Sequence, residues 1–180
     1  MPTFAEAMAR QNDVVTSPDG NIKARIEGGN ITDLQFRPDT FERYTDTGLA
    51  EQLEYFSKLV AVQRVRSRRK ALKEALGDGY QDGSRKPVSS AEREAARREN
   101  EIDVQVKSSN IKCTLLDAHN WKISIRPGTT KNVSEEAFIQ EAGQVTKEMI
   151  SQLRAKLHAM RMDVYGPSHI YKGMAGSQKS

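Results

Sequence analysis

The stretch NIKARIEGGNITDLQFRP, residues 21–38, returns as NIKCTLLDAHNWKISIRP at residues 110–127, without a gap and at an offset of 89. Five of the eighteen positions are identical, and apolar side chains recur at the same places in both copies. These side chains alternate with a period of two, which is typical of strands with one buried face. Between the alternating runs, residues 27–30 and 117–120 are rich in Gly, Asn and Asp, which suit tight turns. Each stretch therefore predicts a β-hairpin.

A helix is expected after each hairpin, again at the same offset. Thr45 and Ser134 correspond and are favourable N-caps, and acidic residues follow both of them. The apolar residues then step by four, three and four in both copies, the spacing of a single helical stripe: Leu49, Leu53, Phe56 and Val60, against Phe138, Ala142, Val145 and Met149. Two unrelated hairpins are the alternative. We interpret the shared spacing as a tandem duplication.

The segments upstream of the hairpins extend the repeat. Residues 2–12 and 90–100 predict short helices, and residues 13–16 and 101–107 predict one more strand in each half. The expected fold class is α+β, with two tandem α-β-β-β-α units. Each unit would hold a three-stranded antiparallel sheet with a short N-terminal and a long C-terminal helix, and the two would pair as a pseudo-dimer. The expected boundaries are unit 1 at 1–77, a flexible linker at 78–89, unit 2 at 90–165 and a disordered tail at 166–180.

Composition narrows the class of protein. The 180 residues carry a formal net charge of +4, and 29 % of them are charged. Cys113 is the only cysteine, it falls on the inward side of a predicted strand, and it is expected to be a buried thiol. The chain offers no internal disulfide, no run of about 18 apolar residues and no signal-peptide pattern. These observations favour a cytoplasmic protein that does not span a membrane.

The first half resembles the YbaB/EbfC family of small bacterial nucleoid-associated proteins. A short helix, the segment SPDGNIKARI, a turn, ITDLQFRPDTF and a long helix follow one another over residues 3–76. The Ser-Pro-Asp-Gly turn at residues 17–20 is similar to the actinobacterial branch. The match weakens over residues 90–162, where Lys107-Ser108-Ser109 takes the place of that turn.

The resemblance implies a homodimer with a β-sheet body and long projecting helices, which binds DNA with little sequence preference and lies in the nucleoid. Members of the family usually carry one such unit, whereas this chain carries two. Pairing within one chain or pairing between two chains therefore both stay open. Some actinobacterial relatives in the family are linked to type VII secretion, which keeps a role without DNA open as well.

The strongest local feature is RVRSRRKALK, residues 64–73, which is rich in cations and has no acidic residue. Its basic residues are Arg64, Arg66, Arg68, Arg69, Lys70 and Lys73. On a helix they would form a flank able to follow a phosphate backbone without reading sequence. The alternative is a solvated helix face with surplus charge. A second apolar stripe, Val62, Val65, Leu72 and Leu76, is expected to pack on a partner helix.

Evidence for an enzyme is weak. The three histidines, His119, His158 and His169, lack ligand spacing, and no phosphate-loop motif occurs. We expect no catalytic residue, no metal and no cofactor. The sequence thus predicts a non-enzymatic protein that binds double-stranded DNA through residues 64–73. The alternative is a protein-binding adaptor or chaperone, linked to type VII secretion, without DNA binding.

Overall fold

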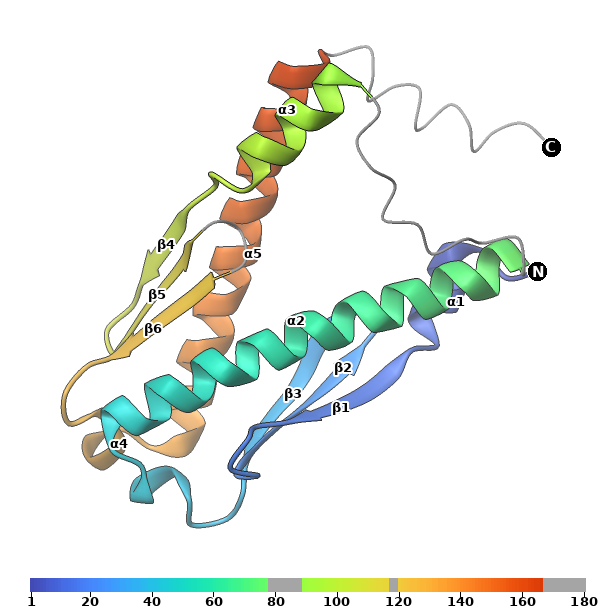
Figure 1. Ribbon diagram of the computed structural model, residues 1–180. Helices are drawn as coiled ribbons and strands as arrows, with labels where there is room; N and C mark the ends of the chain where they lie inside the picture. The colour runs from blue at the N-terminus through green and yellow to red at the C-terminus, as the bar shows by residue number, and fades with distance from the viewer. Residues whose placement is uncertain (78–88, 117–119, 167–180) are drawn as a thin grey trace.

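The computed structural model describes residues 1–77, 89–116 and 120–166 (Figure 1). The first half contains α1 (Phe4–Ala9), β1 (Asn12–Thr16), β2 (Ile22–Glu27), β3 (Asn30–Phe36), the 3-10 helix η1 (Phe41–Arg43) and α2 (Asp46–Leu76). The second half contains α3 (Ser90–Glu99), β4 (Val104–Lys107), β5 (Ile111–Leu116), β6 (Asn120–Ile125), α4 (Thr129–Asn132) and α5 (Glu135–Tyr165).

Both predicted hairpins are confirmed, in matching register. The sheets are antiparallel, with strand orders β1-β2-β3 and β4-β5-β6. Ile22 pairs with Phe36 in the first sheet, and Ile111 pairs with Ile125 at the equivalent place in the second. Alternate residues of β2 and of β5 are buried, so each sheet turns one face to the core, as the period of two requires. The predicted turn at 117–120 falls almost wholly outside the described residues.

The two long helices begin where the caps predict. The Thr45 hydroxyl accepts a hydrogen bond from the backbone N–H of Gly48 at 3.0 Å, and the Ser134 hydroxyl accepts one from Ala137 at 3.2 Å. Each cap satisfies a backbone donor that the first helical turn would leave unpaired. The predicted stripe is buried in α2, from Leu49 to Val60; in α5 all of it is buried except Ala142, which is partly buried against the core.

The expected layout of two plain α-β-β-β-α units is wrong. The chain carries an additional helix, α4, between β6 and α5, and the corresponding place before α2 holds only η1. Gly128 makes α4 feasible: its φ of 87° is left-handed, and a Cβ there would lie 2.9 Å from the side-chain nitrogen of Asn132. The second half is therefore α-β-β-β-α-α, and the architecture is α+β with two three-stranded antiparallel sheets.

Helix α2 also packs differently from the expectation that its second apolar stripe meets a partner helix. Its first half lies along β6 of the other sheet, where the Glu54 carboxylate accepts a hydrogen bond from the backbone N–H of Ile123 at 2.9 Å. Its second half lies on β1 and α1 of its own unit, where the Ser67 hydroxyl donates to Asp13 at 2.7 Å. Figure 1 shows α2 passing β6 before it runs out over the first sheet.

The halves share one core at the junction near the start of the long helices. Phe138 of α5 contacts Phe36 and Phe41 of the first half, with ring centroids 6.1 and 5.2 Å apart. The Asp46 carboxylate, at the start of α2, accepts hydrogen bonds from the backbone N–H groups of Gly128 at 2.7 Å and Thr130 at 2.9 Å. From this junction the two arms diverge, each a sheet with its long helix (Figure 1).

The predicted linker and tail, at 78–89 and 166–180, lie outside the described residues except for their first or last position. In the described ranges, none of the helices has the length and apolar character needed to cross a membrane.

Candidate nucleic-acid interface

All six predicted basic residues lie on the distal half of α2, beyond its contact with β6. Five of them are exposed and one is partly buried. The exposed residues are Arg66, Arg68, Arg69, Lys70 and Lys73. The helix is anchored beneath them by Ser67 and Ala71, which are buried against α1 and β1. The cations therefore stand on a helix that is rigidly attached to the first sheet.

Helical geometry divides the six into two groups. At 100° per residue, Arg66, Arg69 and Lys73 lie on the side opposite the buried line of α2, and Lys70 lies at the edge of that side. We call these four residues the basic face. Arg64 and Arg68 project from the flank between the basic face and the buried line. The predicted cluster is thus one compact group of four with two neighbours, and not a single surface of six.

Arg64 is the member that differs most from the prediction, because it is partly buried. Burial, and then the nearby positive charge of Arg154 on α5, lower the pKa of Arg64 from its ordinary value. Neither arginine forms an ion pair within the part of the chain that the structure describes. Two cations from different halves therefore lie near enough for their charges to repel each other.

The solvent side of α2 also carries a row of apolar residues, at positions that the prediction either missed or buried. Tyr55 is 56 % exposed, Leu59 42 %, Val62 49 % and Val65 51 %. We call these four residues the apolar row; it lies N-terminal to the basic face on the same side of the helix. Val62 and Val65 were expected to pack on a partner helix, and no such helix covers them among the described residues.

The sequence did hold a signal for this row. Tyr55, Leu59 and Val62 step by four and three, which is a second helical stripe beside the buried one. Such a stripe predicts burial against another element. Within the chain, α2 contacts β6, α1 and β1 through its opposite side. The prediction included only Val62 and Val65, in a stripe expected to pack on a partner helix, and the structure leaves all four residues facing solvent.

Helix α3 also carries arginines, and two of them, Arg97 and Arg98, are paired with carboxylates. The guanidinium of Arg97 contacts Glu94 at 2.8 Å and Glu101 at 2.6 Å, and that of Arg98 contacts Asp163 of α5 at 2.5 Å. These cations are neutralised by partners on the same or a neighbouring helix. They offer less positive charge to a ligand than the basic face of α2 does.

The described residues show no arrangement suited to catalysis by a metal or thiolate. Within them, no group of three or more His, Cys, Asp or Glu side chains is placed to hold a metal ion. Cys113 is buried as expected, and burial, then the charge of Glu54, raise the pKa of its thiol to about 11. A thiol with so high a pKa is a poor nucleophile near neutral pH. His119 and His169 lie outside the described residues.

Comparison with models of known protein families, with curated proteins and with solved structures found no match.

Proposed function

We propose that this chain binds double-stranded DNA with little sequence preference, through the basic face of α2 with Arg64 and Arg68 beside it. The observation that carries the proposal is the exposure of five cations within two turns of a well-anchored helix, in a stretch without an acidic residue. Cations spaced along one helix side can contact successive phosphates and release the counterions that DNA holds. The resemblance to the YbaB/EbfC family noted from the sequence supports the same proposal, and with it a location in the bacterial nucleoid.

Salt dependence is the expected signature of this mode of binding. If the five exposed cations each contact one phosphate, affinity for duplex DNA falls roughly 10²–10³-fold between 50 and 200 mM salt. Affinity for duplexes of unrelated sequence should differ little, because phosphate contacts carry no base information. Both quantities can be measured by fluorescence anisotropy with labelled 30-base-pair duplexes.

The decisive variant is the triple charge reversal Arg66→Glu, Arg69→Glu and Lys70→Glu, which removes the basic face. Its control is Lys107→Glu, Lys112→Glu and Lys122→Glu, which changes the net charge equally at exposed positions of the second sheet. The first variant should lose DNA binding at 50 mM salt, and the control should keep most of it. Equal loss in both would show that net charge alone governs binding, and no binding by the wild type would end the proposal.

The apolar row favours a second candidate function, a protein-binding adaptor. Tyr55, Leu59 and Val62 present a helix side that another amphipathic helix could cover. Changing Tyr55, Leu59 and Val62 together to Ser tests this candidate. Loss of association with a partner protein, with DNA affinity unchanged, would separate the adaptor role from DNA binding.

A further inference from the structure

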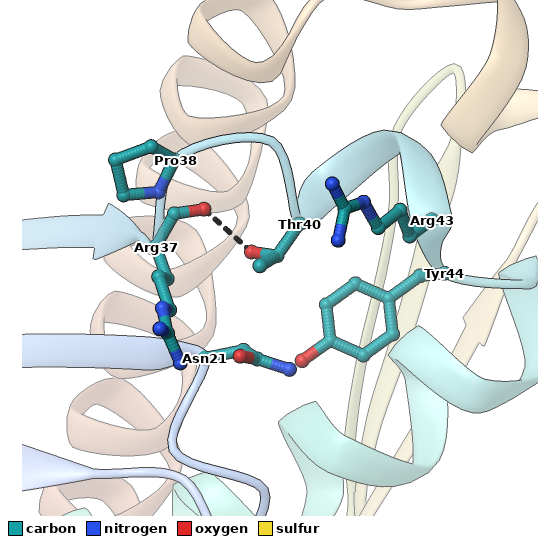
Figure 2. Close-up of a pocket in the computed structure, with 6 residues that line it drawn as sticks. All are labelled: Asn21, Arg37, Pro38, Thr40, Arg43 and Tyr44. Carbon is teal, nitrogen blue, oxygen red and sulfur yellow. Dashed lines mark hydrogen bonds between the residues drawn. The ribbon is translucent and has the colours of Figure 1, made fainter.

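A cavity of about 550 Å³ opens on the first half, away from the basic face. It lies where the end of β3 and η1 approach the turn before β2. Its lining consists of Asn21, Arg37, Pro38, Thr40, Arg43 and Tyr44. Figure 2 shows Arg37 beside Asn21 on one side of the cavity, and Arg43 with Tyr44 on the other side. A space of this volume accommodates a small organic ligand.

The two arginines share the segment 37–43 with Asp39 and Glu42, and neither carboxylate forms an ion pair with them among the described residues. Neither guanidinium forms an ion pair or a hydrogen bond with another of the residues that the structure describes. Thr40 closes the loop between them, because its hydroxyl donates to the backbone carbonyl of Arg37 at 2.6 Å. The loop thus fixes the backbone of Arg37 close to that of Arg43 while leaving both guanidinium groups their hydrogen-bond donors.

Asp19 is the carboxylate that bonds to the cavity wall, and its oxygens are already used. It accepts hydrogen bonds from the Ser17 hydroxyl at 2.5 Å, from the backbone N–H of Asn21 at 3.1 Å, from the Asn21 side chain at 3.3 Å and from the Tyr44 hydroxyl. Four donors saturate one carboxylate. Asp19 therefore orients Asn21 and Tyr44 at the cavity wall and leaves Arg37 and Arg43 to other anions.

The second half has kept part of this cavity lining and lost the part that carries the second charge. Asn110, Arg126, Pro127 and Thr129 stand at the positions of Asn21, Arg37, Pro38 and Thr40. Asn132 and Val133 stand in place of Arg43 and Tyr44, so one guanidinium remains where the first half has two. Arg126 is exposed and supplies a matched control for Arg37.

We propose that the cavity between Arg37 and Arg43 binds a phosphate-bearing ligand of nucleotide size. The planar guanidinium group presents N–H donors in a fork that matches two oxygens of a phosphate, and two such forks from opposite walls suit a phosphate or diphosphate group. Asn21 and Tyr44 then bound the space left for the remainder of the ligand. The phosphate can come from a free nucleotide or from a nucleic-acid strand. This site lies apart from the basic face and does not depend on the proposed DNA contact there.

Isothermal titration at low salt with inorganic pyrophosphate and with ADP tests the free ligand, and anisotropy with duplex DNA tests the strand. The variants are Arg37→Ala with Arg43→Ala, the conservative pair Arg37→Lys with Arg43→Lys, and the control Arg126→Ala. We expect the alanine pair to weaken pyrophosphate or ADP binding by about tenfold or more, the lysine pair to weaken it in part, and the control to leave it unchanged. Circular dichroism of each variant confirms that these exposed substitutions leave the fold intact.

Each outcome of these measurements either supports or overturns the cavity as a phosphate-binding site. Loss of ADP binding in the alanine pair, with binding kept when Arg66, Arg69 and Lys70 become Glu, assigns a free phosphate ligand to the cavity. Absence of ADP and pyrophosphate binding, together with about tenfold weaker DNA binding in the alanine pair only, assigns the phosphate to nucleic acid. Equal loss in the alanine pair and in Arg126→Ala, or no effect on any of these ligands, overturns the proposal.

Discussion

Helices α2 and α5 each contain 31 residues, begin after a hydroxyl cap and bury a stripe with the same spacing. Their solvent sides differ at the positions of the apolar row and of the basic face. Where α2 has Tyr55, Leu59 and Val62, α5 has Gln144, Glu148 and Ser151. Where α2 has the basic face, α5 has Ala155, His158, Ala159 and Met162.

The difference teaches which side of each helix the fold constrains. Buried positions must fill a fixed space beside the sheets, so their spacing is shared. Solvent positions have no such requirement, and both the basic face and the phosphate-sized cavity occur in the first half only. If the basic face and the cavity bind ligands as proposed, the first half carries the binding surfaces.

The largest expected effect tests whether the halves form one folding unit. Phe41 of the first half is buried against Phe138 of the second, so Phe41→Ala leaves a cavity in the shared core. The change should lower the free energy of unfolding by about 3–5 kcal/mol. The measurement is urea denaturation followed by the fluorescence of Trp121, the single tryptophan, which lies on β6 of the second half.

A matched control for this experiment is Ile31→Ala, also in the first half but 41 % exposed and away from the aromatic junction. It should shift the Trp121 transition far less than Phe41→Ala does. If neither substitution moves the Trp121 midpoint, the second half unfolds independently and the shared core does not couple the halves.

The second prediction compares equivalent residues at the start of the two long helices. Asp46→Ala removes the acceptor for two backbone N–H groups of α4, whereas Glu135, at the equivalent position of α5, makes no side-chain hydrogen bond with the described residues. Because Asp46 is only partly buried, we expect Asp46→Ala to cost about 1–2 kcal/mol and Glu135→Ala less than about 0.5 kcal/mol. Thermal and urea unfolding of both variants measure the difference, and similar losses would show that both acids act only on the helix dipole.

The third prediction concerns two carboxylates that accept equivalent hydrogen bonds but come from different elements of the chain. Asp19 accepts from the backbone and side-chain nitrogens of Asn21, and Glu141 of α5 accepts from those of Asn110 at 2.7 and 2.8 Å. Partial burial opposes ionisation of each group, yet hydrogen bonds hold the pKa of both below its ordinary value. The side chain of Ser17 lowers the pKa of Asp19 most, followed by Tyr44 and Asn21, and the side chain of Ser108 lowers that of Glu141 most, followed by Asn110. The turn between β1 and β2 has five residues, 17–21, and contains the acid itself. The turn between β4 and β5 has three residues, 108–110, and its acid comes from α5.

A lowered folded-state pKa means that each carboxylate contributes stability above its ordinary pKa, 3.8 for Asp19 and 4.5 for Glu141, and loses it as pH falls through the folded-state value. We expect Asp19→Asn and Glu141→Gln each to cost about 1 kcal/mol at pH 7, after allowance for exposure. The gap between each variant and the wild type should narrow as pH is lowered from 5 toward about 2. A gap that stays constant over urea titrations in this range would contradict the role given to the charges.

The smallest effect is expected at Gln52, which stands in α2 where α5 has Glu141. Its side-chain oxygen Oε1 is buried and has no hydrogen-bond partner among the described residues. Gln52→Met should therefore raise the free energy of unfolding by about 0.5 kcal/mol, since a buried unpaired oxygen is removed at similar volume. Glu141→Met at the equivalent position should do the opposite. Destabilisation by both would indicate that Gln52 has a partner outside the described residues.

Local pattern was enough to predict the hairpins, the caps and the buried stripes. These features depend on residues near one another in the chain, such as Thr45 with Gly48 or Ile22 with Phe36. Helix α4 was not predicted because residues 129–132 lack apolar periodicity, and Asp46, 82 residues before Gly128, binds its first turn. The path of α2 along β6 escaped prediction for the same reason, since Glu54 and Ile123 are 69 residues apart.

The candidate site was predicted in part. A run of cations without acids identified the exposed residues of α2, because local charge surplus favours solvent. Helix periodicity could have separated Arg64 from the others, since it lies four residues after Val60 and so close to the buried line of α2. The apolar row was missed because a stripe indicates only that a surface is suited to burial, and not whether this chain supplies the cover. The cavity needed the turn at Asp19 to be placed against η1, which no local pattern encodes.

The path of α2 along β6 affects which sheet edge can pair with a strand of another molecule. Strand β6 forms a sheet edge, and Glu54 occupies the N–H of Ile123 that an incoming strand would use. The edge at β3 lacks comparable cover, since α5 makes few contacts with it. Two other features oppose the addition of a strand there: the irregular register at Arg25 and Ile26, and the exposed charge of Asp33. Fibril growth in destabilised variants is therefore expected to start at β3, and neutralising Asp33 would speed it.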